Sequence, residues 1–528
     1  MKTDIQNSNS QNVDVQNLEK QTRRDFLAFA GVGTLGTATG LSAIMESKPL
    51  SADETVTNNT ANTVTDTYML SRTIPVANEI YDIAVLGGGP AGVGAAISAA
   101  RLGAKVLLVE SNGCLGGMGT SGLVTEFDPM ANGEEMLVGG LMREIVETLY
   151  KRNFIQPGLD PNTWRKHSHR WTPFQVEGYK LLLDELTTAA GVQINFFTRA
   201  IDVDADKEKG TVNGVILHNI EGYRYVKAKT FIDATGHAEI ADLCGAQCRE
   251  AGVDTPRINP TTLMSLYTGI DWNKFWTKSQ GTALNEAIKE KHFTQIDRLL
   301  PGMFPVNHTV GNLNGGHMFH LNALHCKDLT DGIMLGRRLA QEYKSFYQKY
   351  MPGCENLQLV ITANQVGVRE SRCVMGEYEL NIDDYMARRK FPDQIGLFCK
   401  YVDIHPYDES DEEWHRFMVD AGFAQGNTTR YKDGESFGIP YGILVPKGWR
   451  NLWVAGRCAS ADVRAHGSIR VQPACSMMGQ AAGTAAVQSI KTGQPANDLD
   501  TEMLVKTLRN AGANLPQETL SKTMTRKN

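Results

Sequence analysis

The chain has 528 residues, of which 41% are hydrophobic and 21% charged, so it is long enough to bury a large core and too apolar to be disordered throughout. Its formal net charge is −6, from 53 Lys and Arg against 59 Asp and Glu. The chain therefore lacks the excess of positive charge that binding a phosphate backbone requires. We therefore expect a globular protein that does not bind nucleic acid. The nine cysteines are scattered, so they predict neither a disulfide framework nor an iron–sulfur cluster.

Residues 1–45 have the order of an export signal. Arg23 and Arg24 precede an uncharged stretch at 26–45, which contains four glycines and is weakly apolar for a membrane span. This pattern is typical of a twin-arginine signal and predicts export to the periplasm, with membrane attachment only through an uncleaved signal. Residues 46–78, rich in Thr, Asn and Asp, predict a disordered linker.

A strand, a glycine-rich turn and a helix follow one another directly after this linker. Residues 80–86 are apolar and β-branched, as in a buried strand, and lead straight into the turn at 87–92. The helix after the turn ends at Gly103, and a second strand ends at Glu110. Such a unit is typical of a dinucleotide site, in which the turn and the helix N-terminus hold a pyrophosphate. The residues expected to bind the cofactor here are Gly87, Gly89, Pro90, Ala91 and Gly92.

The next segment indicates which dinucleotide the site binds. Glu110 lies 18 residues beyond Gly92, where its carboxylate can accept hydrogen bonds from the two ribose hydroxyls and would repel a 2′-phosphate. FAD and NAD fit this position, and NADP does not. A second glycine-rich loop at 113–122 favours FAD, because glycines let the backbone lie against a ribityl chain and a flat ring. The contacts expected from this loop are Gly116, Gly117 and Met118.

With these two loops, three further segments make the chain similar to the bacterial FAD-dependent oxidoreductases of the glutathione-reductase-type flavoprotein superfamily. They are an Ala-Thr-Gly sequence at 234–236, a segment at 365–378 and a segment at 451–473. The segment at 365–378 resembles a subfamily that includes relatives of the flavoprotein component of heterodisulfide reductase. The resemblance covers about residues 80–491 and implies contacts with FAD from Ala234, Thr235, Gly236, Gly456, Arg457, Asp462, Val471 and Gln472.

The resemblance also implies an α/β fold. Its core is a discontinuous, Rossmann-like FAD-binding domain of the glutathione-reductase type, with an inserted α+β substrate or cap domain. The expected parts are the FAD-binding domain at 79–250 and 445–495, the cap domain at 251–444 and a C-terminal tail at 496–528. Because Arg457 stands where the superfamily usually has Asp, the ribityl contact falls to Asp462.

Two side chains just before the helix predicted at 473–490 are the leading candidates for the chemistry. A helix dipole favours negative charge at its N-terminus, and the resemblance implies that this end lies at the flavin ring. His466 would then be the general base in an alcohol oxidation, and Arg470 would stabilise the reduced flavin. In the reverse direction, Arg470 or Arg369 would clamp the substrate or donate a proton.

Two other groups of side chains remain open to more than one interpretation. Arg369 and Arg372 either clamp a substrate carboxylate or form structural pairs with Glu370 or Glu377. Four histidines in a Gly- and Asn-rich stretch line a polar pocket or lie in a surface loop, and we expect no metal among them because no carboxylate is suitably spaced. These histidines are His308, His317, His320 and His325.

The sequence after residue 250 contains no second dinucleotide motif, so electrons must pass through the substrate or an external donor or acceptor. We expect an FAD-dependent dehydrogenase or reductase that transfers a hydride between a small polar organic substrate and flavin N5. The alternative is an electron-transfer flavoprotein, related to the flavoprotein component of heterodisulfide reductase, that docks to a redox partner. A closed polar pocket favours the enzyme, and an open flavin edge within an apolar patch favours the electron-transfer protein.

Overall fold

The computed structural model describes residues 70–160, 172–255, 257–420 and 430–516. The expected export signal, with Arg23 and Arg24, lies outside these residues, as does most of the expected linker. From Thr73 onward the described residues form one compact unit. Its first strand begins at Val76, three residues before the predicted start of the FAD-binding domain at residue 79.

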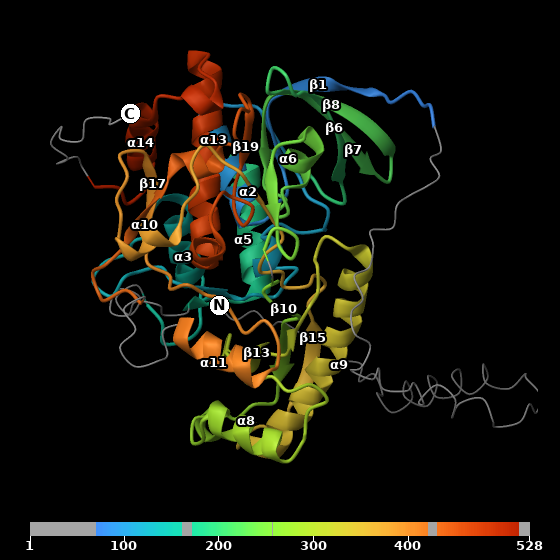
Figure 1. Ribbon diagram of the computed structural model, residues 1–528, viewed down its shortest axis with the longest axis vertical. Coiled ribbons are helices and arrows are strands. Elements are labelled where there is room, and N and C mark those ends of the chain that lie inside the picture. Colours follow the sequence, from blue (N-terminus) through green and yellow to red (C-terminus); the bar gives the residue numbers. More distant parts are fainter. Residues whose placement is uncertain (1–69, 161–171, 256, 421–429, 517–528) are drawn as a thin grey trace, which may run out of the picture. The chain divides into compact units, whose positions relative to one another are not determined.

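A seven-stranded sheet is the centre of this unit (Figure 1). Five strands pair in parallel in the order β5-β2-β1-β8-β19, while β7 and β6 continue the sheet beyond β8 as antiparallel strands. The parallel strands β2 and β19 are wholly buried because apolar side chains pack on both faces of the sheet, from helices on one face and from β6, β7 and a short helix at 239–244 on the other. This confirms the predicted mixed α/β fold. The strands are β1 (Val76–Leu86), β2 (Val106–Val109), β5 (Gln193–Asn195), β6 (Arg199–Asp206), β7 (Thr211–Asn219), β8 (Gly222–Asp233) and β19 (Leu452–Val454).

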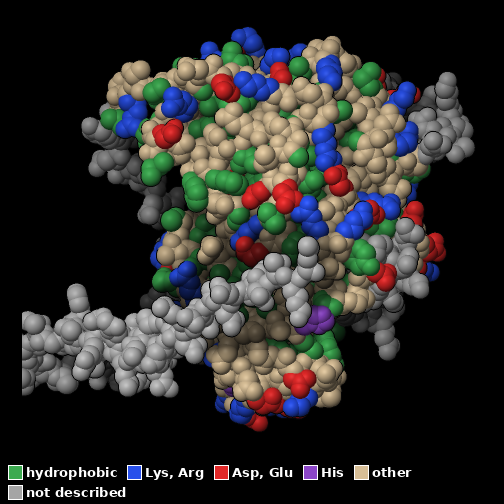
Figure 2. All heavy atoms as spheres, turned by 180° about the vertical axis from the view of Figure 1, so that it is seen from behind, with side chains coloured by type: hydrophobic (Ala, Val, Ile, Leu, Met, Phe, Trp, Pro, Cys, Tyr) green, Lys and Arg blue, Asp and Glu red, His purple; other side chains and the backbone are tan. Residues whose placement is uncertain are grey.

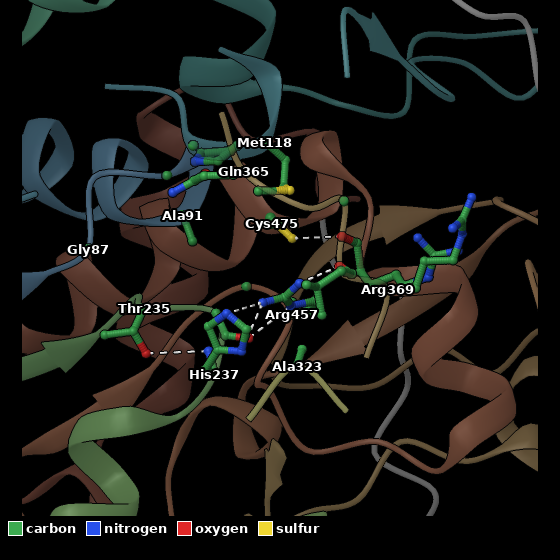
Figure 3. A pocket seen from close by; sticks show the side chains of 18 of the residues that line it. Gly87, Ala91, Met118, Thr235, His237, Ala323, Gln365, Arg369, Arg457 and Cys475 are labelled. Carbon is green, nitrogen blue, oxygen red and sulfur yellow. Dashed lines mark hydrogen bonds between the residues drawn. The ribbon is translucent and has the colours of Figure 1, made fainter. Parts of the chain in front are cut away.

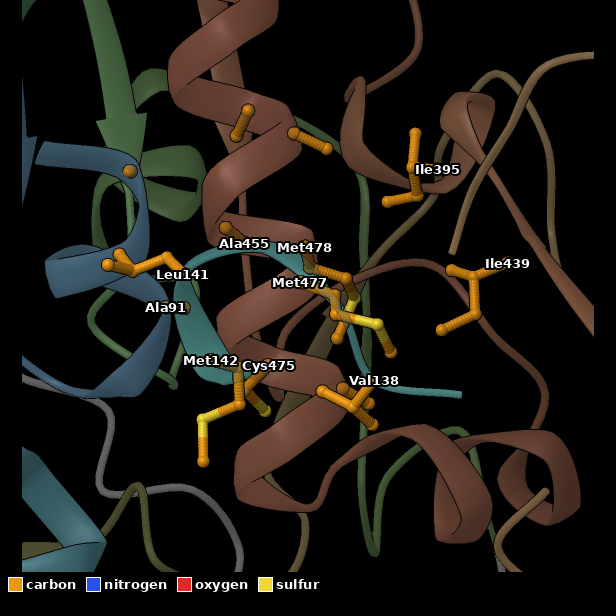
Figure 4. Close-up of a cluster of buried hydrophobic side chains, with 14 of the residues drawn as sticks. Ala91, Val138, Leu141, Met142, Ile395, Ile439, Ala455, Cys475, Met477 and Met478 are labelled. Carbon is orange, nitrogen blue, oxygen red and sulfur yellow. The ribbon is translucent and has the colours of Figure 1, made fainter. Parts of the chain in front are cut away.

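Two helices far apart in the sequence, α2 (Pro90–Arg101) and α13 (Gln472–Thr492), pack tightly against each other. A Cβ added at Gly479 would lie 1.9 Å from the carbonyl oxygen of Ala91, so the contact requires glycine there. Figure 4 shows Met477 and Met478 of α13 together with apolar side chains of neighbouring segments, among them Leu141 and Ile395. Through this contact the C-terminal part of the chain completes the core of the dinucleotide-binding unit.

Three more helices pack around this pair: α3 (Gly140–Lys151), α5 (Val176–Ala189) and α14 (Thr501–Asn510). Helix α14 follows the short helix η3 (Ala496–Asp498), and its Leu504 and Leu508 are buried in the main core. The prediction of a tail from residue 496 is therefore wrong for these residues. Their apolar spacing places a buried face against α13.

A second sheet, with the antiparallel order β12-β13-β11-β15, has a hydrophobic cluster of its own beneath three helices. It lies inside the range predicted as a cap domain. Later residues of that range, including Tyr385 and Ile395, instead belong to the main core. The elements of this second part are β11 (Ser265–Thr268), β12 (Gly302–Pro305), β13 (Val310–Asn314), β15 (Gln358–Thr362), α7 (Trp272–Phe275), α8 (Gln280–Lys289) and α9 (Cys326–Tyr350).

The remaining elements are shorter, and five of them, β3, β10, β16, η1 and α6, contribute residues to the site described below. The strands are β3 (Glu126–Phe127), β4 (Thr172–Pro173), β9 (Cys248–Glu250), β10 (Thr261–Thr262), β14 (His317–Met318), β16 (Arg372–Val374), β17 (Gln394–Phe398) and β18 (Phe437–Pro440). The helices are η1 (Gly117–Gly119), α6 (Glu239–Cys244), α10 (Ile382–Met386), α11 (Asp411–Asp420), η2 (Tyr441–Leu444) and α12 (Val463–Ile469).

On the face shown in Figure 2, Lys and Arg side chains are interspersed with Asp and Glu rather than gathered by sign. None of the helices in the described ranges is both long enough and apolar enough to span a membrane.

Candidate functional site

A cavity of about 980 Å³ extends through the unit. Its lining includes the turn at the start of α2, buried charged side chains such as Arg369 and Asp403, and apolar side chains of α9 such as Leu329 and Ile333. This volume is at the upper end of the range of small-molecule sites, and the lining combines apolar walls with a few polar groups. One space thus joins the predicted dinucleotide motif to side chains that can do chemistry.

The turn before α2 has the shape that a pyrophosphate site needs. Gly87 has a φ of 106°, a conformation that favours glycine, and a Cβ added at Gly92 would lie 1.7 Å from the carbonyl oxygen of Gly87. By contrast, a Cβ added at Gly89 would meet no atom of the described residues within 4 Å, although Gly89 lines the cavity together with Pro90 and Ala91. The space beside Gly89 is therefore open to a ligand at the N-terminus of α2.

Glu110 lines the same cavity and also braces the loops around it. Its Oε2 accepts a hydrogen bond from the backbone N–H of Gly88 at 2.7 Å, and its Oε1 accepts from the backbone N–H of Asn112 at 2.7 Å. The Gly116 N–H donates to the Gly88 carbonyl oxygen at 2.8 Å and so ties the second glycine-rich loop to the first. Of that loop, Gly117 and Met118 line the cavity, while Gly116 lies behind them.

The segment after β8 forms another wall with Ala234, Thr235 and Gly236 (Figure 3). Arg457 reaches across it: Nε donates to the Gly236 carbonyl oxygen at 2.8 Å, and Nη1 donates to the Val368 carbonyl oxygen. Burial lowers the pKa of Arg457 to about 10, which reflects a guanidinium held away from water. Because Arg457 lines the cavity together with Gly456, its charge is available to an anionic group of a cofactor.

Asp462 does not have the role assigned to it. Its Oδ1 accepts the backbone N–H of Ala465 at 2.7 Å and so caps α12, while its Oδ2 accepts the backbone N–H of Ile382 at 2.7 Å. Asp462 also lies outside the cavity lining. The contact with a ribityl chain is therefore corrected: this carboxylate is engaged with two backbone segments.

The N-terminus of α13 faces the cavity through Val471 and Gln472. The Gln472 side-chain amide donates to the carbonyl oxygens of Val124 at 2.7 Å and Glu126 at 3.0 Å, which fixes the loop that follows η1. Its Oε1 is buried without a hydrogen-bond partner among the described residues. This acceptor and the free N–H groups of the first helical turn can bind a polar ring edge.

His466 is also placed differently from its prediction as a general base. It is 3% exposed, lies outside the cavity lining, and its Nε2 is 2.7 Å from the carbonyl oxygen of Arg457. Since a carbonyl oxygen only accepts, Nε2 carries the proton and cannot take another. Burial lowers the pKa of His466 to about 3, and Arg470 contributes to this. His466 is thus a neutral donor that holds the Arg457 backbone.

The other two predicted catalytic residues do lie in the cavity wall. They are joined there by His317, one of the four histidines singled out in the sequence, and by Asp297, Asp403 and His405, which the sequence did not indicate. Arg470 donates from Nη2 to Asp403 Oδ2 at 3.1 Å, and His405 Nε2 lies 3.1 Å from Asp403 Oδ1. The His405 Nδ1 atom lies 2.6 Å from His317 Nε2, and His317 Nδ1 is 2.9 Å from Asp297 Oδ2. His405 and Asp403 line the cavity, with His317 and Asp297 buried behind them.

The number of protons shared by the two histidines and the two aspartates follows from their three contacts. Three contacts link two carboxylates through two imidazoles, and each contact needs one proton, whereas two neutral imidazoles carry only two N–H groups. When both imidazoles are neutral, one of the three contacts therefore lacks a proton, so the pair can accept one more. Burial lowers the pKa of His405 well below its usual value, and the nearby Arg369 contributes to this. The pair can thus take up a proton at the cavity wall.

Lys400, Asp128 and Glu126 also belong to the polar part of the lining. Lys400 and Asp128 form a buried ion pair. The Glu126 side chain accepts no hydrogen bond from the described residues, and its Oε2 is fully buried. Burial and the negative charge of Asp128 raise the pKa of Glu126 to about 8, so this carboxyl is mostly neutral at pH 7.

The structure decides part of the alternatives that the sequence left open for Arg372 and for the four histidines at 308–325. Arg372 pairs with Asp242 at 3.2 Å and Glu250 at 3.8 Å, a structural role with partners other than those predicted. Of the four histidines at 308–325, His317 is buried in the chain of contacts above and the other three are exposed. The described residues contain no group of three or more His, Cys, Asp and Glu that could hold a metal ion.

The fold and this cavity define a dinucleotide-binding α/β protein. Residues 82–510 match the family described as FAD dependent oxidoreductase, and the chain belongs to that family. This confirms FAD as the cofactor and an oxidoreductase as the class of protein.

Curated proteins match the chain over short segments. It is 53% identical over 49 residues to a dihydrolipoyl dehydrogenase of Trypanosoma brucei brucei, which is 9% of this chain and 10% of that protein. It is 54% identical over 46 residues to a ferredoxin–NADP reductase of Leuconostoc citreum strain KM20, 9% of this chain and 14% of that protein. The chain thus spans only about a tenth of the length of the curated relatives it matches.

Among solved structures, a geranylgeranyl bacteriochlorophyll reductase-like protein from Thermoplasma acidophilum is 14% identical, with a TM-score of 0.40 and coverage of 82% of this chain and 83% of that chain. The flavin-dependent brominase Bmp2 is 12% identical, with a TM-score of 0.41 and the same two coverages.

Proposed function

We propose that the protein transfers a hydride between a small polar organic substrate and N5 of an FAD bound in the cavity. The observation that carries this proposal is the single space that joins the open backbone at Gly89 to the buried cluster of Arg369, His405 and Asp403. FAD supplies a two-electron acceptor or donor at its ring. The FAD-binding part would be of the glutathione-reductase type, with residues of 251–444 covering the substrate.

The chain's own residues would bind the cofactor from several sides. The α2 N-terminus beside Gly89 would hold the pyrophosphate, Glu110 the ribose, and the backbone at 117–118 the ring. Arg470 and the α13 N-terminus line the same cavity, where the helix end favours negative charge by roughly 0.3–2 kcal/mol. These groups would stabilise the charge that arises when the cofactor is reduced.

His405 takes over the proton transfer that the sequence assigned to His466. When a substrate hydroxyl is oxidised, its proton passes to the His405–His317 pair, and the same proton returns to the substrate in the reverse direction. Asp297 and Asp403 hold the two rings in place from either end. The buried polar lining of the cavity also favours an enzyme over an electron-transfer flavoprotein, which has no need for such a lining.

The test is an anaerobic mixture of the oxidised holoprotein with sugars, polyols, hydroxy acids and amines, in which flavin absorbance is followed. Bleaching by one class of compound, together with reoxidation by its oxidised product, supports hydride transfer. If no organic compound changes the flavin while a reduced protein partner does, the electron-transfer alternative holds.

We also propose that the protein is exported by the twin-arginine route to the periplasm, a proposal supported by Arg23, Arg24 and the weakly apolar stretch after them. A small-molecule substrate and an external electron acceptor or donor would be its partners.

A further inference from the structure

Arg369 is a buried cation with no carboxylate partner in the described part of the chain, and it lines the cavity. It is 8% exposed, its Nη1 donates to the carbonyl oxygen of Pro260 and to Thr262 Oγ1, both at 2.7 Å, and its Nη2 makes only a 3.5 Å contact with His317. A guanidinium has five N–H donors, so Nε–H and at least one Nη2–H remain free. These two donors are parallel and form the edge that binds a carboxylate bidentately.

The charged groups around Arg369 are engaged with partners other than Arg369. Lys400 is paired with Asp128, and Arg470 is paired with Asp403. Asp297 is in contact with His317 at 2.9 Å, and Glu126 is mostly neutral at pH 7. Burial, with a contribution from Arg470, lowers the pKa of Arg369 to about 9. An anion bound at the free edge of Arg369 would remove this cost of an uncompensated buried charge.

We propose that the substrate carries a carboxylate that the Nε–Nη2 edge of Arg369 binds, and that it belongs to the 2-hydroxy acid and 2-oxo acid couple. This inference rests on the proposed function and specifies its substrate class. Its basis is the short span between the two groups: His317 Nε2 lies 3.5 Å from Arg369 Nη2 and 2.6 Å from His405 Nδ1. A substrate that reaches both groups would have its hydroxyl on the carbon next to the carboxylate.

The reaction balances as follows. The O–H bond of the 2-hydroxy acid breaks and its proton passes to the His405–His317 pair, while the C2–H bond breaks and both electrons leave with the hydrogen as hydride to the bound FAD. The product is the 2-oxo acid, and reduction of a 2-oxo acid returns the same proton and hydride.

The binding test uses oxalate, a dicarboxylate with no hydrogen to transfer, titrated into the oxidised holoprotein by calorimetry and flavin difference absorbance. Arg369→Gln is expected to weaken oxalate at least about 30-fold, because it removes the charged partner of a buried carboxylate. Arg369→Lys keeps the charge but loses the pair of parallel N–H donors, so its oxalate affinity is expected to lie between those of Arg369→Gln and the wild type. Arg388→Gln is the control, since this arginine is paired with Glu435 outside the cavity lining.

Two results of this titration would overturn the inference. One is an oxalate affinity that stays the same in Arg369→Lys and Arg369→Gln. The other is a changed flavin reduction potential in Arg369→Gln with an unchanged oxalate affinity, which would assign the guanidinium to the cofactor instead. If Arg369→Gln does not retain FAD, Arg369→Lys decides, with a loss of about tenfold or more expected.

A second arm compares lactate, 3-hydroxybutyrate and propane-1,2-diol as reductants of the flavin. Lactate and the diol differ only at the carboxylate, so the inference predicts bleaching by lactate and little by the other two compounds. Equal bleaching by the diol would overturn the inference that Arg369 binds a substrate carboxylate, while the proposed hydride transfer would stand. If oxalate binding depends on Arg369 but no hydroxy acid bleaches the flavin, the carboxylate site at Arg369 is supported and the proposed function is contradicted.

Discussion

The buried carboxyl of Glu126 leads to a prediction about how stability depends on pH. The carboxyl is 8% exposed, its Oε2 has no hydrogen-bond partner among the described residues, and its pKa is raised from 4.5 to about 8 by burial and by Asp128. In the unfolded chain the same carboxyl ionises near its ordinary pKa. Its contribution to stability is therefore fully present below about pH 4.5 and is lost as the pH rises through about 8.

The size of this loss follows from the two pKa values. A tenfold change in proton affinity corresponds to about 1.4 kcal/mol, so the difference for Glu126 amounts to about 5 kcal/mol of unfolding free energy above both pKa values. Glu126→Gln replaces the neutral carboxyl by a neutral amide of similar shape. The variant should therefore avoid the loss, and its stability relative to the wild type should rise by about 3–5 kcal/mol between pH 5 and pH 9.

Urea unfolding of the FAD-free proteins, followed by tryptophan fluorescence at pH 5 and pH 9, measures this difference. The control is Glu177→Gln, because the side chain of Glu177 is 79% exposed. If the wild type and Glu126→Gln lose stability in parallel between the two pH values, Glu126 is not a buried neutral carboxyl.

Three further predictions concern the proton carrier, the ribose site and export. His405→Gln should retain FAD and slow anaerobic flavin reduction by the substrate by a factor of ~10²–10⁴, whereas His466→Gln should change the rate less than about tenfold; the reverse order would restore His466 as the base. Glu110→Ala should weaken FAD by roughly 1–3 kcal/mol in equilibrium dialysis, and an unchanged affinity would remove Glu110 from the site. Replacing Arg23 and Arg24 by Lys should leave the precursor in the cytoplasm, and export in a strain without the twin-arginine pathway would refute the signal.

The parts of the site that the sequence predicted come from contiguous residues. Strand, turn and helix at 80–101 follow one another directly, so glycine spacing and apolar pattern are enough to place Gly87 and Gly89 at a helix N-terminus. Glu110 is likewise placed by the length of one β-α-β unit. The structure adds that Glu110 braces Gly88, a contact that depends on side-chain rotamers rather than on spacing.

The polar cluster could not be predicted in this way, because its members come from distant segments. Asp297, His317 and His405 are brought together by the second sheet and the loops that join it to the main core. Two local signals existed: the Gly- and Asn-rich stretch that contains His317, and the appearance of Lys400, Asp403 and His405 directly after the wholly buried β17. His466 shows the opposite error: it precedes the helix at the cavity, but the turn of α12 directs its ring to a backbone carbonyl.

We expect FAD to lie with its pyrophosphate beside Gly89, and the roles proposed for the other cavity residues depend on that orientation. The direct measurement is the FAD content of purified Gly89→Val, with Gly281→Val as the control at an exposed position of α8, where an added Cβ meets only Ser279 Oγ at 3.7 Å. Because a Cβ added at Gly89 meets no described atom within 4 Å, the variant should fold with an unchanged circular dichroism spectrum and contain no FAD, while the control contains one FAD per chain. A folded, yellow Gly89→Val protein with a full equivalent of FAD would contradict the account.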